Sequence, residues 1–262
     1  MTSRPAAASP AWLARIEDAC LNASAPPQQR WLDGWLMRLS PGKARRARSV
    51  HALFDGHLPL DERLADAETV YRAAGLPLIF RITPFTQPAG LDGELDRRGF
   101  VRVDETLVLY CPVLPEHADT LPDGLTLESP CHVDFADAVG ELRASPPAHR
   151  RSHAERLVLS PVPYQGWLVR RPTDGAIVAC AQTARDGDMV GLYDVFVHPA
   201  ARGQALSRRL CAKLLAQARG NGARLGYLQV QADNAPAVSV YRRLGFVDGY
   251  RYHYRGRAGQ TD

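Results

Sequence analysis

The order of apolar and amphipathic segments in residues 125–255 restricts the folds open to this chain. A short strand at 125–129 precedes two predicted helices, Val133–Ala144 and His149–Leu159. Residues 166–199 predict three strands in a meander, because the Asp-Gly turns TDG and RDGD separate the apolar runs. A helix, a buried strand, a short helix and a last strand follow. This order favours a mixed α/β fold, in which an antiparallel meander leads into a helical crossover.

The step from strand to helix after Val197 is suited to binding an anion. Arg202 precedes the predicted helix, and the small residues Gly203, Ala205 and Ser207 alternate at its start. Small side chains let backbone N–H groups approach a ligand closely, and a helix N-terminus carries partial positive charge. Taken alone, the pattern fits either a pyrophosphate site or an ordinary glycine turn.

Two segments together resemble a known superfamily. After a strand the chain reads VHPAARGQALS, and after the next strand a short helix reads NAPAVSVYRRLGF. This pair resembles the GNAT superfamily of acyl-CoA-dependent N-acyltransferases, and the resemblance extends over about Leu125–Arg255. The phosphate loop of that family reads R/Q-x-x-G-x-G/A. The matching residues here are Arg202, Ala205 and Ser207, so small residues replace both glycines.

The resemblance implies a fold and an activity. The expected fold is a GNAT-like mixed central sheet flanked by helices. The expected enzyme is an N-acetyltransferase that moves an acetyl group from acetyl-CoA to a primary amine by direct attack in a ternary complex. Neither a metal nor a covalent enzyme intermediate is needed. The alternative is a catalytically weak acyl-CoA sensor or scaffold on the same fold, which the substituted glycines favour.

The resemblance also implies which residues contact the substrates. The pantetheine arm is expected to bind, as an added strand would, to backbone groups of the strand that ends at Val197. Backbone N–H groups near Val195 are expected to stabilise the oxyanion. Asn234 is expected to face the pantetheine arm. Tyr241 is expected to protonate the leaving thiolate, with a packing role as the alternative. The expected acetyl-CoA contacts besides Asn234 are Val195, Phe196, Val197, Arg202, Gly203, Gln204, Ala205, Leu206, Ser207 and Arg208.

The group that accepts the amine proton is open at this point. Some members of the family carry a glutamate five residues before the asparagine, but Gln229 stands there and cannot act as a base. Asp194, within LYDVFV, is the catalytic candidate, because apolar neighbours predict a raised pKa. A structural aspartate and a water relay are the alternatives. His198, before a proline, is expected to belong to a turn.

The first half of the chain contains a shorter copy of the same pattern. ELDRRGF, ending at Phe100, is similar to VYRRLGF, ending at Phe246, and each follows one predicted strand and precedes another. A proline-rich segment near Asp119 reads as a linker. We therefore expect a degenerate GNAT-like domain over residues 1–118 and a catalytic domain over residues 119–262.

The first copy lacks the residues that carry the chemistry. The same spacing places Leu95 where the second copy has Tyr241, and Arg48 where it has Asp194. The first domain is therefore expected to be structural or to shape the acceptor pocket. Four arginines on predicted strands are candidates for that second role, with a solvated sheet face as the alternative: Arg38, Arg46, Arg48 and Arg81.

Composition and charge argue against several other classes of protein. The net charge of +4 over 262 residues is too small and too dispersed for a dedicated nucleic-acid binder. Five scattered cysteines without a C-x-x-C pair argue against disulfides and a zinc site. Charges at Arg15, Glu17 and Asp18 argue against a signal peptide, and no apolar run is long enough for a membrane helix. We expect a cytoplasmic protein, either a monomer with an internal pseudo-dimer or a homodimer.

Overall fold

The computed structural model describes residues 9–260, which belong to two compact units that interleave along the chain. The first unit contains the chain up to Ala23, Val108–Val230 and Asn234–Gly249. The second contains Ser24–Leu107, Gln231–Asp233 and the chain from Tyr250 onwards. The expected boundary at residues 118 and 119 falls inside the first unit. As a statement about domains it remains a prediction.

The first unit is built on the predicted meander. Its strands follow the order β10-β9-β8-β7-β6, with parallel pairing only between β9 and β10. The turn between β8 and β9 is the predicted RDGD turn, where Gly187 takes a φ of +56°. The strand bounds are β6 (Thr126–Glu128), β7 (Tyr164–Arg170), β8 (Ile177–Asp186), β9 (Met189–Val197) and β10 (Leu225–Gln231).

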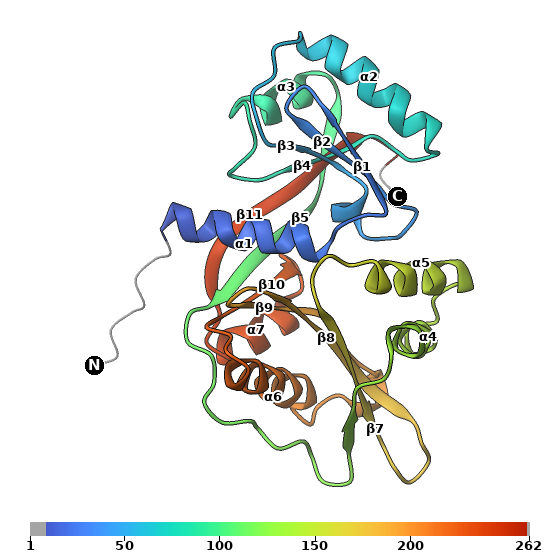
Figure 1. Cartoon of the computed structure of the whole chain (residues 1–262), viewed down its shortest axis with the longest axis vertical. Coiled ribbons are helices and arrows are strands. Elements are labelled where there is room, and N and C mark those ends of the chain that lie inside the picture. Colours follow the sequence, from blue (N-terminus) through green and yellow to red (C-terminus); the bar gives the residue numbers. More distant parts are fainter. Residues whose placement is uncertain (1–8, 261–262) are drawn as a thin grey trace. The chain divides into compact units, whose positions relative to one another are not determined.

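Helices cover both faces of this sheet, and Figure 1 shows α4 and α5 apart from α6 and α7. Phe135 and Val139 of α4 pack with Leu157 of α5 against strands β7 and β8. The helix α6 contacts β8 and β9 and also packs against α7, burying residues that include Leu210 and Leu214. The helices of this unit are α1 (Pro10–Ala23), α4 (His132–Leu142), α5 (Pro147–Val158), α6 (Leu206–Gly220) and α7 (Ala235–Arg243).

The packing of α4 on the sheet depends on one glycine. Phe135 is fully buried. A Cβ atom at Gly166 of β7 would lie 2.3 Å from the ring of Phe135. Because no side chain fits at that distance, Gly166 lets the helix approach the sheet closely enough to bury the ring.

The second unit repeats the element order of the first. The succession β1-β2-β3-α2-β4-α3-β5 matches β7-β8-β9-α6-β10-α7-β11. In both, the first three strands pair antiparallel, and the third strand pairs parallel with the fourth. The elements are β1 (Gln28–Leu32), β2 (Trp35–Leu39), η1 (Arg45–Ala47), β3 (Val50–Ala52), α2 (Leu60–Ala73), β4 (Ile79–Ile82), α3 (Leu91–Arg97), β5 (Phe100–Cys111) and β11 (Val247–Arg257).

The last strands of the two successions are exchanged. Strand β11, which ends the second succession, pairs antiparallel with β4 of the first, with Tyr254 opposite Arg81. Strand β5, which ends the first succession, neighbours β10 in the strand order. This exchange is the reason that the compact units interleave along the chain.

The hairpin at the start of this unit is tight. Strand β1 covers Gln28–Leu32 and begins directly after Pro26 and Pro27. Asp33 and Gly34 both have positive φ, 39° and 87°, and form the tight turn between β1 and β2. Strand β3 is short, Val50–Ala52, and follows the 3₁₀ turn η1.

The solvated sheet face suggested for the arginines is wrong for two of them. Arg38 and Arg81 are 2% and 1% exposed. Arg38 donates to the backbone oxygens of Ser24 and Arg46, at 2.8 and 3.2 Å. Arg81 stacks on the ring of Tyr252, 3.9 Å from its centroid. Both side chains therefore stabilise the second unit, and a role in shaping the acceptor pocket remains a prediction.

Candidate functional site

The two parallel strands of the first unit pair over only part of their length. The register of β9 with β10 runs from Met189 opposite Leu225 to Leu192 opposite Leu228. Strand β9 nevertheless continues to Val197. Backbone polar groups on a strand edge need hydrogen-bond partners. An extended ligand can supply them to the edge of β9 beyond Leu192 by strand addition.

A β-bulge shapes the same part of β9. On its other edge, Cys180 of β8 opposes Phe196, whereas Gln182 opposes Tyr193. Asp194 and Val195 therefore stand against the single residue between Cys180 and Gln182. Asp194 has a φ of +48°, which is uncommon for a residue other than glycine. Bulges redirect the backbone and side chains of a strand, and this one lies where β9 leaves β10.

The carboxylate of Asp194 lies between a guanidinium and an imidazole. Arg143 Nη1 lies 3.1 Å from Oδ1, and His153 Nε2 lies 3.4 Å from Oδ2. Burial alone would raise the pKa of Asp194, but the nearby His153 imidazole and the charges of Arg143 and Arg156 outweigh it and lower this pKa below its ordinary value. The expectation of a raised pKa is therefore wrong, because the sequence did not reveal these partners.

The loop before α6 presents backbone donors. Gly203 has a φ of +85°, and Ala205, the N-cap of α6, is left-handed at φ +52° and ψ +21°. The cap residue makes no side-chain hydrogen bond, and the first turn of α6 holds no acidic residue. The N–H groups of a first helical turn have no partner within the helix, so this N-terminus suits an anion.

The side chains of the loop differ in their surroundings. Arg202 is exposed, and its Nε donates to the carbonyl of Val197 at 3.3 Å. Arg208 is engaged by Asp119 at 2.9 Å. Leu206 is buried and anchors the helix start, whereas Gln204 is exposed and Ser207 is half-buried. Of the two arginines, Arg202 is therefore the one whose guanidinium has no carboxylate partner within the described residues.

The left-handed conformation of Ala205 leads to a stability prediction. A left-handed conformation costs a residue with a Cβ roughly 1–2 kcal/mol relative to glycine. We expect Ala205→Gly to raise the free energy of unfolding by about 0.5 kcal/mol, after allowance for the extra chain entropy of glycine. Gly203→Ala, at φ +85°, should lower it by about 1 kcal/mol or more. Urea denaturation measures both, and a less stable Ala205→Gly variant would contradict the argument.

The helix α7 presents Tyr241 beside α6. The side-chain oxygen of Asn234 accepts from the Ala237 N–H at 3.2 Å and caps the helix, so this residue is explained first as an N-cap. Tyr241 is 9% exposed, and its ring centroid lies 5.8 Å from that of Phe246. Among the described residues its hydroxyl has no hydrogen-bond partner. Burial, with a smaller contribution from Cys211, raises the pKa of Tyr241, so the phenol is neutral at physiological pH.

Three basic residues beside Asp194 were not predicted from the sequence. Arg143 follows the C-terminus of α4, and its guanidinium lies 5.2 Å from the ring centroid of Phe196. His153 and Arg156 lie on α5, and Arg156 lies 5.4 Å from the ring centroid of Tyr164. Helical periodicity could have placed His153 and Arg156 on one side of α5. Helical periodicity does not indicate that this side of α5 lies against the bulge of β9.

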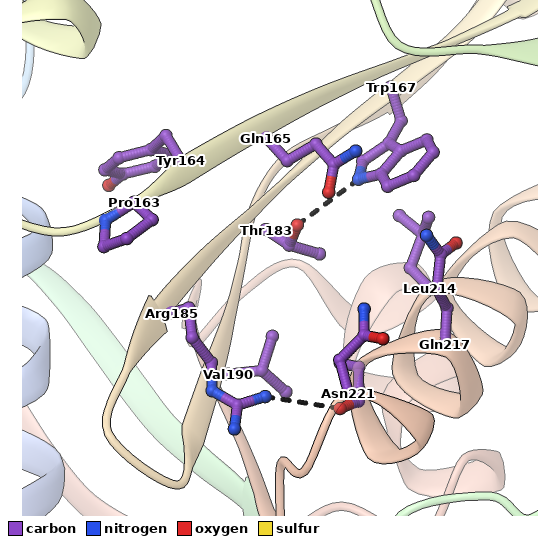
Figure 2. A pocket seen from close by; sticks show the side chains of 11 residues that line it. Pro163, Tyr164, Gln165, Trp167, Thr183, Arg185, Val190, Leu214, Gln217 and Asn221 are labelled. Carbon is purple, nitrogen blue, oxygen red and sulfur yellow. Dashed lines mark hydrogen bonds between the residues drawn. The ribbon is translucent and has the colours of Figure 1, made fainter.

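A separate cavity of about 410 Å³ lies near the C-terminal end of α6, and Figure 2 shows the side chains around it. None of the predicted site residues lines it. Several of its polar groups bond within the protein: Trp167 Nε1 donates to Thr183 Oγ1 at 3.3 Å, and Arg185 Nε donates to the Gly187 carbonyl at 2.6 Å. This cavity is therefore distinct from the site where β9 continues beyond Leu192 without pairing with β10.

Two kinds of feature are absent from residues 9–260. Within this range, no three or more His, Cys, Asp or Glu side chains are grouped so that they could hold a metal ion. No helix in the same range is both long and apolar enough to cross a membrane.

Comparisons with known proteins agree with this geometry. Residues 135–246 match the acetyltransferase (GNAT) family. The uncharacterized N-acetyltransferase YobR of Bacillus subtilis strain 168 is 26% identical over 230 residues, 87% of this chain and 91% of YobR. Mycothiol acetyltransferase of Actinosynnema mirum is 43% identical over 61 residues, which are 23% of this chain and 20% of that protein.

Solved structures share the fold over nearly the whole chain. A GCN5-related N-acetyltransferase from Kribbella flavida aligns with a TM-score of 0.69 at 21% identity, covering 94% of this chain and 96% of its own. A tandem GNAT protein from the clavulanic acid biosynthesis pathway aligns with a TM-score of 0.65 at 19% identity, covering 99% and 92%. The tandem neighbour fits the repeated element order. Residues 135–246 are therefore an acetyltransferase domain of the GNAT family, and the protein that carries this domain is an acyltransferase.

Proposed function

We propose that the protein transfers an acetyl group from acetyl-CoA to a primary amine. The observation that carries the proposal is the early end of the β9–β10 register, at Leu192 and Leu228, in the unit that also holds the anion-binding start of α6. The edge of β9 suits the amide-bearing pantetheine arm. The loop from Arg202 to Arg208 suits the pyrophosphate of acetyl-CoA.

In the proposed mechanism, two groups of this chain act on the reacting atoms, and a third positions one of them. The amine attacks the thioester carbonyl directly, and the backbone N–H near Val195 stabilises the negative charge that develops on the oxygen. Tyr241, which stays protonated because burial raises its pKa, gives its proton to the departing thiolate. Asn234 fixes the start of the helix that carries Tyr241.

The amine proton leaves through water in this proposal. A carboxylate with a lowered pKa is a weak base, and that of Asp194 already accepts from Arg143. We therefore assign Asp194 to holding the cations beside the bulge, and we retain the water relay that was the alternative to a dedicated base.

The alternative function, a catalytically weak acyl-CoA sensor, is not favoured. Of the two substituted glycine positions that supported it, the one at Ala205 still adopts a left-handed conformation. The named relatives are acetyltransferases. The phenol of Tyr241 also has no hydrogen bond to a described residue that would explain its presence as a purely structural group.

Calorimetric titration with acetyl-CoA tests the proposal. We expect binding in the micromolar range, weakened about tenfold by Arg202→Ala through loss of one charge-assisted phosphate contact worth roughly 1.5 kcal/mol. Arg224→Ala, which removes an exposed arginine just before β10, is the matched control and should bind as the wild type does. If neither acetyl-CoA nor CoA binds, the proposed function is wrong.

A further inference from the structure

The acceptor side of the proposed site carries excess positive charge. Tyr241 and α6 lie on one face of the sheet, whereas Asp194 meets Arg143 and His153 of the α4–α5 layer. If acetyl-CoA occupies the α6 side, the amine arrives from the α4–α5 side. There, two guanidinium groups, Arg143 and Arg156, act on a single carboxylate, that of Asp194. The cluster is cationic whatever the charge of His153.

A second observation points to a missing ligand at the same place. Gln182 is fully buried on β8, directly opposite Tyr193 in the register and next to the bulge. Neither its Nε2 nor its Oε1 has a hydrogen-bond partner among the described residues. Burying an amide without partners costs roughly 1–3 kcal/mol per group, and native proteins rarely leave such groups unsatisfied. The partner that Gln182 lacks must both accept and donate hydrogen bonds.

We propose that the acceptor is an amine with a carboxylate close to its amino group, of which free α-amino acids are the simplest class. Arg143 and Arg156 attract the carboxylate. Gln182 donates from Nε2 to the carboxylate and accepts at Oε1 from the amine. Arginine suits this role because its planar fork matches a carboxylate. Polyamines and aminoglycosides, which are polycationic, are repelled by the same cluster. This inference rests on the proposed function and names its substrate class.

The test compares acceptors that differ only in the carboxylate. Thiol release from acetyl-CoA is measured with a panel of L-amino acids, with the methyl ester of each, and with spermidine and kanamycin. For the preferred side chain, we expect kcat/KM at least tenfold higher for the amino acid than for its ester. The amine of the ester is the less basic, and therefore the more deprotonated at pH 7, so its intrinsic reactivity runs against this preference.

Two variants assign the selectivity to residues. Arg143→Gln should raise KM for the amino acid at least tenfold and leave KM for the ester and the affinity for acetyl-CoA unchanged. Arg171→Gln, which removes an arginine paired with Asp174 in the turn after β7, is the control and should change none of these. Gln182→Leu should raise both Tm and the KM for the amino acid. A fall in Tm with an unchanged KM would mean that the amide is structural, and would overturn its assigned role.

The outcomes distinguish a failure of the amino-acid inference from a failure of the proposed acetyltransferase function. If acetyl-CoA binds and esters, spermidine or kanamycin react as well as amino acids or better, the inference is wrong and the acetyltransferase proposal stands. If acetyl-CoA binds and no amino acid is acetylated, the inference is again wrong. If acetyl-CoA does not bind, the proposed function is wrong, and the inference falls with it.

Discussion

Replacement of Tyr241 by phenylalanine is expected to lower kcat at least about 100-fold, the smaller end of the range for losing a general acid. The affinity for acetyl-CoA should change little, because the phosphate and pantetheine contacts are elsewhere. The fold should also be unaffected. The phenylalanine ring keeps the packing against Phe246, and the lost hydroxyl has no hydrogen-bond partner among the described residues. Steady-state kinetics, calorimetry and thermal melting measure the three quantities separately.

A matched tyrosine should show the opposite pattern. Tyr227 lies in β10, and its hydroxyl donates to the Ala19 carbonyl at 3.1 Å and lies 3.3 Å from the Tyr193 hydroxyl. Tyr227→Phe should therefore lower the free energy of unfolding by about 1 kcal/mol and leave kcat within about threefold. If Tyr241→Phe keeps full activity, the tyrosine is a packing residue and the thiolate is protonated by water.

Replacement of Asp194 by asparagine is expected to destabilise the protein at pH 7 by about 2 kcal/mol, within the range for hydrogen bonds to charged groups. The variant leaves Arg143 and Arg156 without their shared counter-charge. Because folding lowers the pKa of Asp194, its contribution is fully present above the ordinary value of 3.8 and is lost as pH falls below it. The difference between wild type and variant should therefore shrink below pH 4. Urea denaturation at pH 7 and at pH 3 measures it.

An exposed ion pair provides the control for this prediction. Glu141 lies 3.5 Å from Arg150, and its side chain is 73% exposed. Glu141→Gln should change the stability by less than about 0.5 kcal/mol at either pH, as expected of a solvated pair. Equal effects of the two substitutions at pH 7 would mean that the environment of Asp194 is no different from the open surface.

The strands and helices of the first unit were accessible from the sequence because local signals fixed them. The Asp-Gly turn that ends at Gly187 and the spacing of Leu206, Leu210 and Leu214 each act over a few residues. The same kind of signal was present at Asp33–Gly34 and identifies the β1–β2 hairpin.

The acceptor side of the site could not be predicted in this way. Asp194 and Arg143 are 51 positions apart, and their contact depends on how α4 packs on the sheet. That packing depends on Gly166, which allows Phe135 to sink against β7. The periodicity within each segment does not indicate that Arg143 and Asp194 are in contact. The pKa of Asp194 was therefore predicted in the wrong direction. The turn and the helix start at residues 202–208 were predictable because these residues are contiguous.

The exchange of the last strands also sets an order of events during synthesis. The sheet that begins near Ser24 needs Tyr250–Arg257 beside β4. These residues leave the ribosome more than 140 positions after Leu107, a delay of roughly 7–30 s at ordinary elongation rates. Closing so long a loop is also slow. Until β11 has been synthesised, the edge of β4 that pairs with it remains unpaired. Newly made chains therefore pass through a state in which a strand that is buried in the folded protein can associate with other chains.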